Sequence, residues 1–319
     1  MKKRVYKVEK EDEQKRLDVH IAQKMPIEIS RNLIQNAIIK GQITVNGSQK
    51  KPHYKVKQGD EIQIDFHELV EETKEENILP ENIPLNILYE DEELIVINKP
   101  AGLIVHPTPS IKTGTLVNAL MYHVKDLDKT MQDPSRLGIV HRLDKETSGV
   151  LVVAKNAYSH NLLSKEFKER KTMKYYLALI EGTLKEKEGE IDLPLGRHPI
   201  LRHKRAVVYN GREAITEYKV LKEFGDLATL VWIRLKTGRT HQIRVHFKYI
   251  GNPVIGDSLY GKNKVEKDLQ IPVDRQMLHA LKLGFYHPKS NEWMEFLAPL
   301  PEDFKNLLIT LTNLKRQNS

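Results

Sequence analysis

The segment HRLDKETSG at residues 141–149 leads directly into VLVVA at residues 150–154. The second segment is a short apolar run bounded by turn-forming residues, a pattern typical of a buried strand. The first segment is charged and ends in small polar residues and Gly149, which indicates a loop. Because a rigid strand supports this loop, it is a common position for binding and catalytic side chains.

Asp144 lies between Arg142 and Lys145 in this loop. Nearby cations favour the charged form of a carboxyl group, so we expect Asp144 to be ionised at neutral pH. An ionised and oriented carboxylate can act as a nucleophile or as a general base. Spacing alone favours a simpler interpretation, in which Asp144 forms a structural ion pair with an arginine.

Several longer motifs stand in a fixed order around this loop. They are RLGIV at 136–140, KN at 155–156, KYYLALIEG at 174–182, TGRTHQIRVH at 237–246, GNPVIGD at 251–257 and LHA at 278–280. Together with HRLD they closely resemble the RluA-type pseudouridine synthases, over a region from about Leu85 to Leu300. Several long motifs in one order are much more specific than a single short motif.

The resemblance implies a fold and three site residues. The fold would be α+β, with one long mixed sheet in two halves and an active site in a central cleft. Asp144 corresponds to the catalytic aspartate, and Arg244 to the arginine that pairs with it. Tyr176 corresponds to a tyrosine that would stack on the uracil or accept a proton. Without the resemblance, a buried core tyrosine is the better interpretation of Tyr176.

Pseudouridine formation breaks the glycosidic bond of a uridine, turns the base and rejoins it through carbon. The reaction needs no redox group, group donor or metal, so we expect no cofactor and no metal site. Asp144 would attack either C1′ of the sugar or C6 of the base, and the sequence leaves both routes open. A target base in folded RNA must first leave its stack. Arg142 would fill the vacated space or hold a phosphate. A plain salt bridge to Asp144 is the alternative, and the two roles are not exclusive.

The composition is that of a protein with a large charged surface. Of the 319 residues, 39% are hydrophobic and 29% are charged, and there is no cysteine. Disulfides and cysteine-based catalysis or zinc sites are therefore excluded. No apolar run is long enough to span a bilayer, and no signal-peptide core follows the basic N-terminus. We expect a cytoplasmic monomer that binds RNA and no membrane.

The net charge of +8 is unevenly distributed. Residues 67–93 contain ten acidic residues against the single Lys74, so the rest of the chain carries a net charge of about +17. Two basic bodies joined by an acidic connector favour RNA as the partner. A generic solvated surface is the alternative.

Residues 15–66 have the pattern of a small separate domain. We expect helices from residue 15 and over 31–40, with Ser30 as a cap, a strand at 43–45, a turn at Asn46-Gly47 and a strand at 61–64. The pattern resembles the αL RNA-binding domain shared by a ribosomal protein and some tRNA synthetases. The matching residues are 16–18, Ser30, Arg31, Ile34, Ile38, Gly41, 45–47 and 55–60. The candidate phosphate contacts are Arg31, Gln35, Lys40, Lys50, Lys51, Lys55 and Lys57.

The larger part of the chain interleaves strands with helices. We expect strands at 94–97, 150–154, 175–180 and 228–235, and a helix at 159–170, an irregular alternation that favours α+β. Thr240 would cap a helix that runs to Ile250, with Ile243, Phe247 and Ile250 buried. The alternation of Ile243, Val245 and Phe247 also permits a strand, but 251–253 (GNP) is a good terminator and favours the helix.

A basic loop lies near the middle of the chain. Arg197, Arg202, Lys204 and Arg205 stand close to Gly196 and Pro199. We interpret this loop as a flap that grips phosphates and becomes ordered on RNA binding, and a flexible solvated loop is the alternative. Arg239, in the TGRTHQIRVH motif, is a further candidate RNA contact.

These observations predict three segments and one leading function. Residues 1–66 would form the αL-type domain after a charged lead-in, residues 67–84 an acidic linker, and residues 85–319 the catalytic domain with a short C-terminal tail. The function would be pseudouridine synthesis, with large-subunit (23S) ribosomal RNA as the expected substrate and transfer RNA as the alternative. A non-catalytic ribosome-assembly factor and a hydrolase with paired carboxylates are weaker alternatives.

Overall fold

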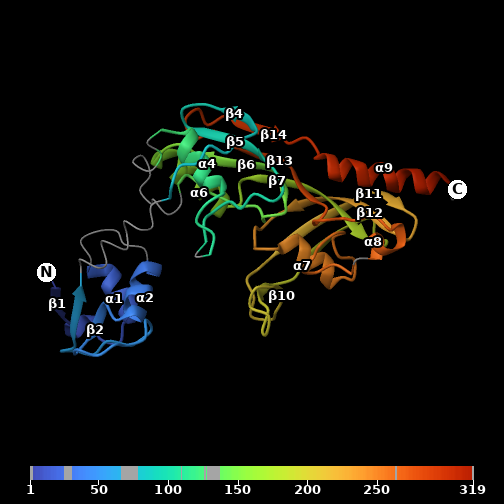
Figure 1. The fold of residues 1–319 in the computed structure, drawn as a ribbon. Coiled ribbons are helices and arrows are strands. Elements are labelled where there is room, and N and C mark those ends of the chain that lie inside the picture. Colours follow the sequence, from blue (N-terminus) through green and yellow to red (C-terminus); the bar gives the residue numbers. More distant parts are fainter. Residues whose placement is uncertain are drawn as a thin grey trace. The chain divides into compact units, whose positions relative to one another are not determined.

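The structure is a computed structural model that describes residues 3–24, 31–65, 78–108, 110–125, 127, 137–262 and 264–317. The chain divides into two compact units, Met1–Asn77, which is blue in Figure 1, and Ile78–Ser319. The boundaries predicted at residues 66 and 84 remain a prediction. Ser30, Arg136, the side chain of Arg31 and residues 67–77 of the predicted linker lie outside the described parts. Within the described ranges, no helix has both the length and the apolar character needed to cross a membrane.

The N-terminal unit packs two helices against an antiparallel sheet of order β1-β3-β2. Its elements are β1 Lys3–Lys7, the 3-10 helix η1 Lys10–Asp12, α1 Leu17–Lys24, α2 Arg31–Lys40, β2 Ile43–Val45 and β3 Glu61–Asp65. Helix α2 has the predicted bounds, and Gly41 follows it in the left-handed conformation expected there. The charged lead-in contains a strand, since β1 pairs with β3 along its whole length.

The second unit is built on one mixed sheet of order β4-β5-β6-β13-β7-β12-β11-β8, with β14 also paired to β13. Its strands are β4 Ile87–Glu90, β5 Leu94–Lys99, β6 Ser148–Ala154, β7 Met173–Glu181, β8 Glu188–Asp192, β11 Ile215–Phe224, β12 Ala228–Leu235, β13 Leu278–Tyr286 and β14 Trp293–Leu297. Strand β13 joins the two halves, because it runs parallel to β6 and antiparallel to β7. The predicted mixed sheet in two halves is confirmed.

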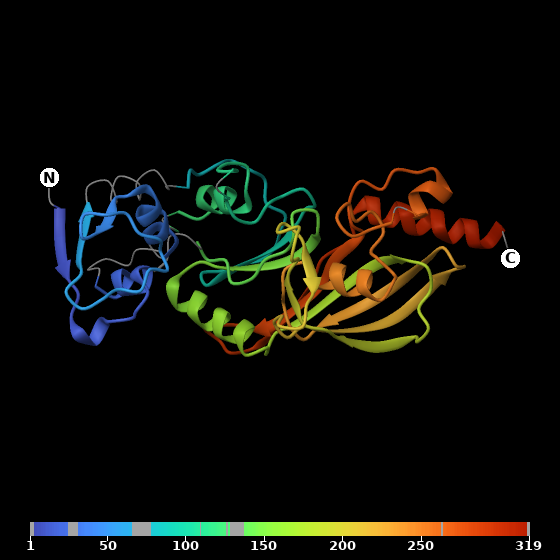
Figure 2. The same ribbon diagram turned by 90° about the horizontal axis from the view of Figure 1, so that it is seen from below.

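Helices cover this sheet, and a short two-stranded hairpin stands beside it. The helices are α4 Leu116–His123, α6 Ala157–Lys168, α7 Gln242–Tyr249, α8 Lys264–Leu269 and α9 Glu302–Gln317. The hairpin consists of β9 Leu195–Arg197 and β10 Arg205–Val207, and β10 lies beside α7 (Figure 1). Helix α9 lies along β11 in both views (Figures 1 and 2).

Strand β7 buries different side chains on its two faces. This is expected from the alternation of a strand, in which residues 176, 178 and 180 share one face and residues 177 and 179 the other. Tyr176, Ala178 and Ile180 belong to one hydrophobic core. Leu177 and Leu179 belong to another, which α9 completes. The helix predicted after residue 240 is also present as α7, but two details were wrong.

The N-cap of α7 is His241 rather than Thr240, and Ile250 is 37% exposed rather than part of the buried stripe. The stripe ends early because α7 itself ends at Tyr249, and Ile250 already belongs to the turn before Gly251.

Gly149 allows the two halves of the sheet to meet directly behind the 141–149 loop. It pairs with Ala280 of β13 and has a φ of 117°. A Cβ atom built on Gly149 would lie 2.2 Å from the backbone oxygen of Ala280. Only glycine fits this position without moving the backbone of one strand.

We expect Gly149→Ala to destabilise the second unit by about 3 kcal/mol or more, because the clash is with backbone rather than with a movable side chain. Gly225→Ala is the matched control, since Gly225 also has a positive φ but its Cβ would meet nothing within 4 Å. Its expected cost is about 1 kcal/mol. Denaturant unfolding followed by tryptophan fluorescence measures both, because both tryptophans of the chain, Trp232 and Trp293, lie in this unit. Equal losses of stability in the two variants would show that the close approach of Gly149 to Ala280 does not require glycine.

Candidate active site

The 141–149 loop opens onto a pocket of about 350 Å³ in the second unit. Its lining is Arg142, Leu143, Asp144, Thr147, Tyr176, Leu235, Arg239, His241, Gln242, Ile243, Arg244 and Leu278. The structure thus brings together the three predicted site residues from three separate elements. Asp144 is the only acidic side chain among the described residues that line this pocket.

Arg244 on α7 connects Asp144 to a second, buried carboxylate. Its Nη1 donates to Oδ2 of Asp144 at 2.9 Å. Its Nε and Nη2 donate to the two carboxylate oxygens of Asp257 at 2.7 and 2.9 Å. The side chain of Asp257 is fully buried, and that of Arg244 is 5% exposed. Burial acts against the charge of Arg244, but Asp257 and then Asp144 outweigh it and raise the pKa of the guanidinium.

The backbone amides of Leu259 and Tyr260 complete the environment of Asp257. Both donate to its Oδ1 at 3.0 Å. The GNPVIGD motif, for which the sequence suggested no role, therefore supplies the group that fixes Arg244. No local pattern could reveal this, because the partners are 13 residues apart and lie on different elements.

The loop that carries Asp144 is held at each of the next four residues. The ammonium of Lys99 donates to the carbonyl oxygen of Lys145 at 3.0 Å, and Arg275 donates to that of Glu146 at 3.1 Å. Thr147 Oγ1 accepts from the side chain of Gln276 at 3.2 Å, and Ser148 Oγ lies 2.9 Å from Nδ1 of His279. These contacts come from β5, from β13 and from the residues just before β13.

Lys99 is the largest side chain that the fold buries completely. Burial lowers its pKa to about 7, although the charges of Glu146 and Asp144 partly offset that effect. Its ammonium also donates to the carbonyl oxygens of Pro100 and Leu103, at 2.7 and 2.9 Å. Together with the carbonyl oxygen of Lys145, these make three acceptors for the three N–H groups of the ammonium. The ammonium is therefore fully hydrogen-bonded without a carboxylate partner.

His141 has a structural role in this loop. Its Nε2 accepts a hydrogen bond from the backbone amide of Val152 at 3.0 Å, and its ring stacks on Phe167 with centroids 4.5 Å apart. Burial, and then the charge of Lys174, lowers the pKa of His141 to about 3. The ring is therefore neutral, as an acceptor nitrogen requires.

Tyr176 lines the pocket from β7 and is 9% exposed. Burial, together with the negative charge of Asp144, raises the pKa of its hydroxyl. The phenol is accordingly protonated at neutral pH. This side chain can therefore offer an aromatic ring, but not a phenolate oxygen, to a molecule in the pocket.

Two residues of the TGRTHQIRVH motif were missed by the sequence reasoning. His241 lines the pocket, and its Nε2 lies 3.9 Å from Oδ1 of Asp144. Gln242 is 2% exposed and hydrogen-bonds to Thr237, Arg239, Ile215 and Thr216. Gln242 thereby fixes the turn that precedes α7. The signal available in the sequence was the position of this amide side chain inside a long motif.

The predicted RNA contacts occupy different positions. Arg142 is exposed at the rim of the pocket, and the ion pair that Asp144 forms among the described residues is with Arg244. The salt bridge between Arg142 and Asp144, which the sequence left open, is therefore not formed. Arg239 lines the pocket and donates through Nε to the carbonyl oxygen of Glu213.

The basic loop is the β9–β10 hairpin. Arg197 and Arg202 are exposed on it, whereas Arg205 is half-buried. The ammonium of Lys204 donates to the carbonyl oxygen of Leu259 at 2.7 Å, so this lysine anchors the hairpin to the second unit. Ile200 at the tip is 82% exposed.

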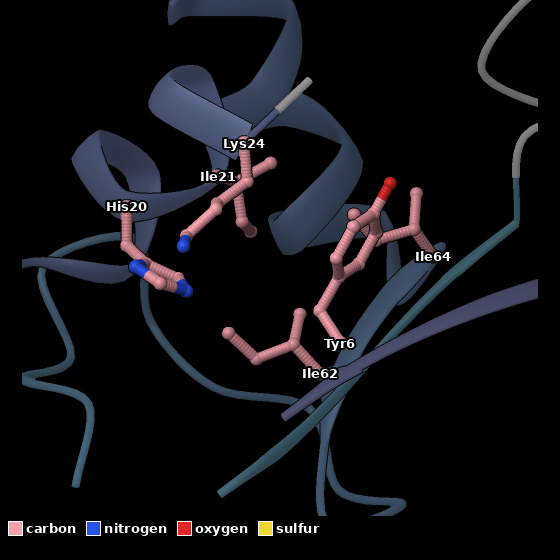
Figure 3. Close-up of a pocket in the computed structure, with 6 residues that line it drawn as sticks. All are labelled: Tyr6, His20, Ile21, Lys24, Ile62 and Ile64. Atoms are coloured by element: carbon pink, nitrogen blue, oxygen red, sulfur yellow. The ribbon is translucent and has the colours of Figure 1, made fainter. Parts of the chain in front are cut away.

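In the N-terminal unit, Lys40 and Lys55 are exposed. Gln35, in contrast, donates to the buried carboxylate of Asp18 at 2.5 Å and has a structural contact there. A pocket of about 190 Å³ also lies in this unit, between α1 and the sheet (Figure 3). It is lined by Tyr6, His20, Ile21, Lys24, Ile62 and Ile64. This lining is mainly apolar and provides no carboxylate.

Among the described residues that line the pocket, the one carboxylate is paired to a buried arginine. A hydrolase with paired carboxylates is disfavoured, because its second acid is absent from the described lining.

The comparisons with known proteins give the family. Residues 93–249 match the family described as RNA pseudouridylate synthase, and residues 15–62 match the S4 domain. An Aquifex aeolicus protein named "Uncharacterized RNA pseudouridine synthase" is 47% identical over 307 residues, which cover 95% of each chain. A Nitrosomonas europaea protein named "Ribosomal large subunit pseudouridine synthase D" is 42% identical over 303 residues, which cover 94% of this chain and 85% of the relative.

A solved structure, human RNA pseudouridylate synthase domain containing 4, superimposes with a TM-score of 0.57 and 27% identity, covering 71% of this chain and 93% of its own. The chain therefore belongs to the RNA pseudouridine synthase family. It is an RNA pseudouridine synthase, an isomerase that acts on RNA, with an S4 domain at its N-terminus.

The neutral state of His141 predicts that the free energy of unfolding decreases at acidic pH. Above pH 6.5 the ring is neutral in the folded and in the unfolded state, so it does not make the free energy of unfolding depend on pH. As the pH falls from 6.5 towards 3, the unfolded chain binds a proton that the folded ring refuses, so the free energy of unfolding decreases by at most about 1.4 kcal/mol per pH unit. His141→Gln keeps an acceptor for Val152 but does not titrate. We therefore expect the wild type to lose stability relative to His141→Gln between pH 6.5 and 4, measured by denaturant unfolding. A pH-independent difference would exclude a neutral buried His141.

Proposed function

We propose that this enzyme converts specific uridines of large-subunit ribosomal RNA into pseudouridine, with Asp144 as the attacking carboxylate. The observation that carries the proposal is the position of Asp144, which is fixed by Arg244 and is the only acid among the described residues of the pocket. The relative from Nitrosomonas europaea supports a ribosomal substrate, since its name assigns it to the large subunit. A ribosomal substrate also agrees with the expected cytoplasmic location.

The reaction would begin with a uridine that has left its stack, because Asp144 cannot reach a base inside a helix. The carboxylate then bonds to C1′ or C6 of the nucleotide, and the glycosidic C1′–N1 bond breaks. The base turns and C5 bonds to C1′. The bond to Asp144 then breaks, C5 loses its proton and N1 gains one. Arg244 keeps the attacking oxygen in place during these steps. Asp257 neutralises Arg244, so that Asp144 is oriented without losing all of its negative charge.

Tyr176 would serve as the platform on which the uracil stacks. It lines the pocket, and its protonated hydroxyl makes it a weak proton acceptor in the resting enzyme. Arg142, exposed at the rim, would occupy the space that the base leaves or hold a neighbouring phosphate.

RNA binding would use both units. In the second unit the contacts would be Arg142, Arg239 and the hairpin residues Arg197, Arg202, Lys204 and Arg205. In the S4 unit they would be Arg31, Lys40 and Lys55. Sequence-independent contacts of this kind hold the backbone of the RNA, while the pocket selects the base.

The test of the catalytic assignment compares Asp144→Asn with the wild type on 23S ribosomal RNA and on transfer RNA, with mass spectrometry to locate pseudouridine. We expect turnover to fall roughly 10⁴-fold or more, because the nucleophile is removed, while RNA affinity stays unchanged. Asp226→Asn, an exposed aspartate in the turn between β11 and β12, is the matched control.

Modification of transfer RNA alone would overturn the proposed ribosomal substrate but would leave the catalytic assignment of Asp144 intact. Undiminished activity of Asp144→Asn would overturn the catalytic assignment itself.

The RNA-binding role of the hairpin predicts a change in salt dependence. Arg197→Glu with Arg202→Glu should weaken RNA binding and reduce the slope of log K against log salt by about 1.5, since two phosphate contacts are lost. Filter binding over a range of salt concentrations measures this slope. Lys185→Glu with Lys187→Glu, on the exposed turn after β7, changes the net charge by the same amount and controls for overall charge. An unchanged slope in the double variant would place the hairpin outside the RNA interface.

A further inference from the structure

His241, the N-cap of α7, adopts an uncommon backbone conformation. Its φ and ψ are 58° and 20°, in the left-handed region that non-glycine residues rarely enter. The buried Gln242 and its hydrogen bonds fix the adjoining turn. Residues kept in such conformations occur preferentially at functional sites, because the surrounding structure must impose them.

The imidazole lies between Asp144 and a tyrosine hydroxyl. Nδ1 is 2.8 Å from the hydroxyl of Tyr260, and Nε2 is 3.9 Å from Oδ1 of Asp144. Arg244 contacts the other oxygen, Oδ2. The two side chains therefore approach the two oxygens of the Asp144 carboxylate separately.

The hydrogen bonds of Tyr260 determine which nitrogen of His241 carries the proton. The hydroxyl oxygen already accepts from the backbone amide of Arg205 at 2.8 Å. Its own proton then has one partner among the described residues, Nδ1 of His241. Burial lowers the pKa of His241, against the charge of Asp144, which agrees with a neutral ring. Nδ1 thus accepts, and the proton of the ring lies on Nε2, directed towards Asp144.

We propose that His241 is a positioning residue for Asp144, and that Tyr260 sets its tautomer and connects it to the β9–β10 hairpin. At 3.9 Å the Nε2–H group is too far from Oδ1 for a hydrogen bond. A shift of about 1 Å closes this gap, and catalytic hydrogen bonds commonly shorten when substrate is bound. RNA held by the hairpin supplies the shift, because Arg205 begins β10 and its amide holds the Tyr260 hydroxyl. The Asp144 carboxylate is then fixed at both oxygens only when RNA is bound.

This inference rests on the proposed role of Asp144, but its first test needs no RNA. Nitrogen-15 NMR of the full-length protein reports the tautomer of His241, and the resonance missing from His241→Gln assigns it. We expect the proton on Nε2 in the wild type, and a change in the Nδ1 signal in Tyr260→Phe. A proton on Nδ1 in the wild type, or a charged ring at pH 7, would overturn the proposal whatever the enzyme modifies.

The second test is kinetic and uses whichever RNA the wild type modifies. His241→Gln keeps an N–H donor with a reach close to that of Nε2, and His241→Asn keeps an amide that is too short but tolerates the left-handed backbone. At saturating RNA we expect the single-turnover rate to fall about 10²-fold for His241→Asn and less than about 10-fold for His241→Gln, with KM nearly unchanged in both. Thermal unfolding checks that both variants fold.

An equal loss of the single-turnover rate in the two His241 variants, or an effect confined to KM, would show that His241 has only a structural role. A wild type that does not act on large-subunit ribosomal RNA, or an active Asp144→Asn, would instead overturn the proposed function. The two failures are therefore distinguishable.

Discussion

The catalytic geometry depends on one guanidinium group shared by two carboxylates. Arg244 gives its bidentate face to the buried Asp257 and a single donor to Asp144. A buried arginine must be paired, and Asp257 meets that requirement alone. Asp144 can then be oriented by a cation that is already neutralised. With two carboxylates for one guanidinium, negative charge remains on Asp144, which agrees with its proposed role as the nucleophile.

A fixed carboxylate is useful only if its backbone is fixed as well. The loop after Asp144 is held by Lys99 from β5, by Arg275 and Gln276 just before β13, and by His279 on β13. These elements converge because β6 and β13 approach closely at Gly149. The junction between the two halves of the sheet therefore positions the loop that carries Asp144. Fixed positions of this kind are what near-attack geometry requires.

The sequence predicted the features that local patterns determine. The strand at 150–154, the helix at 31–40 and the alternating faces of β7 follow from periodicity within a few residues. Asp144, Tyr176 and Arg244 came from the family resemblance, and the structure brings them to one pocket. Asp257, Gln242 and Tyr260 were missed because their roles depend on partners far away in the sequence. The mistaken cap at Thr240 has the same origin, since the turn before α7 is set by the contacts of Gln242 rather than by a capping hydroxyl.

The Arg244–Asp257 pair is better explained by catalysis than by stability. Replacing a buried ion pair by apolar side chains of similar volume is often neutral or stabilising by about 1–4 kcal/mol. A fold selected for stability alone would have no need for this pair, or for a lysine buried as completely as Lys99. Both cations act on the segment that begins at Asp144, one through the carboxylate and one through the backbone. This placement agrees with the proposed role of Asp144, in which activity is obtained at the cost of stability.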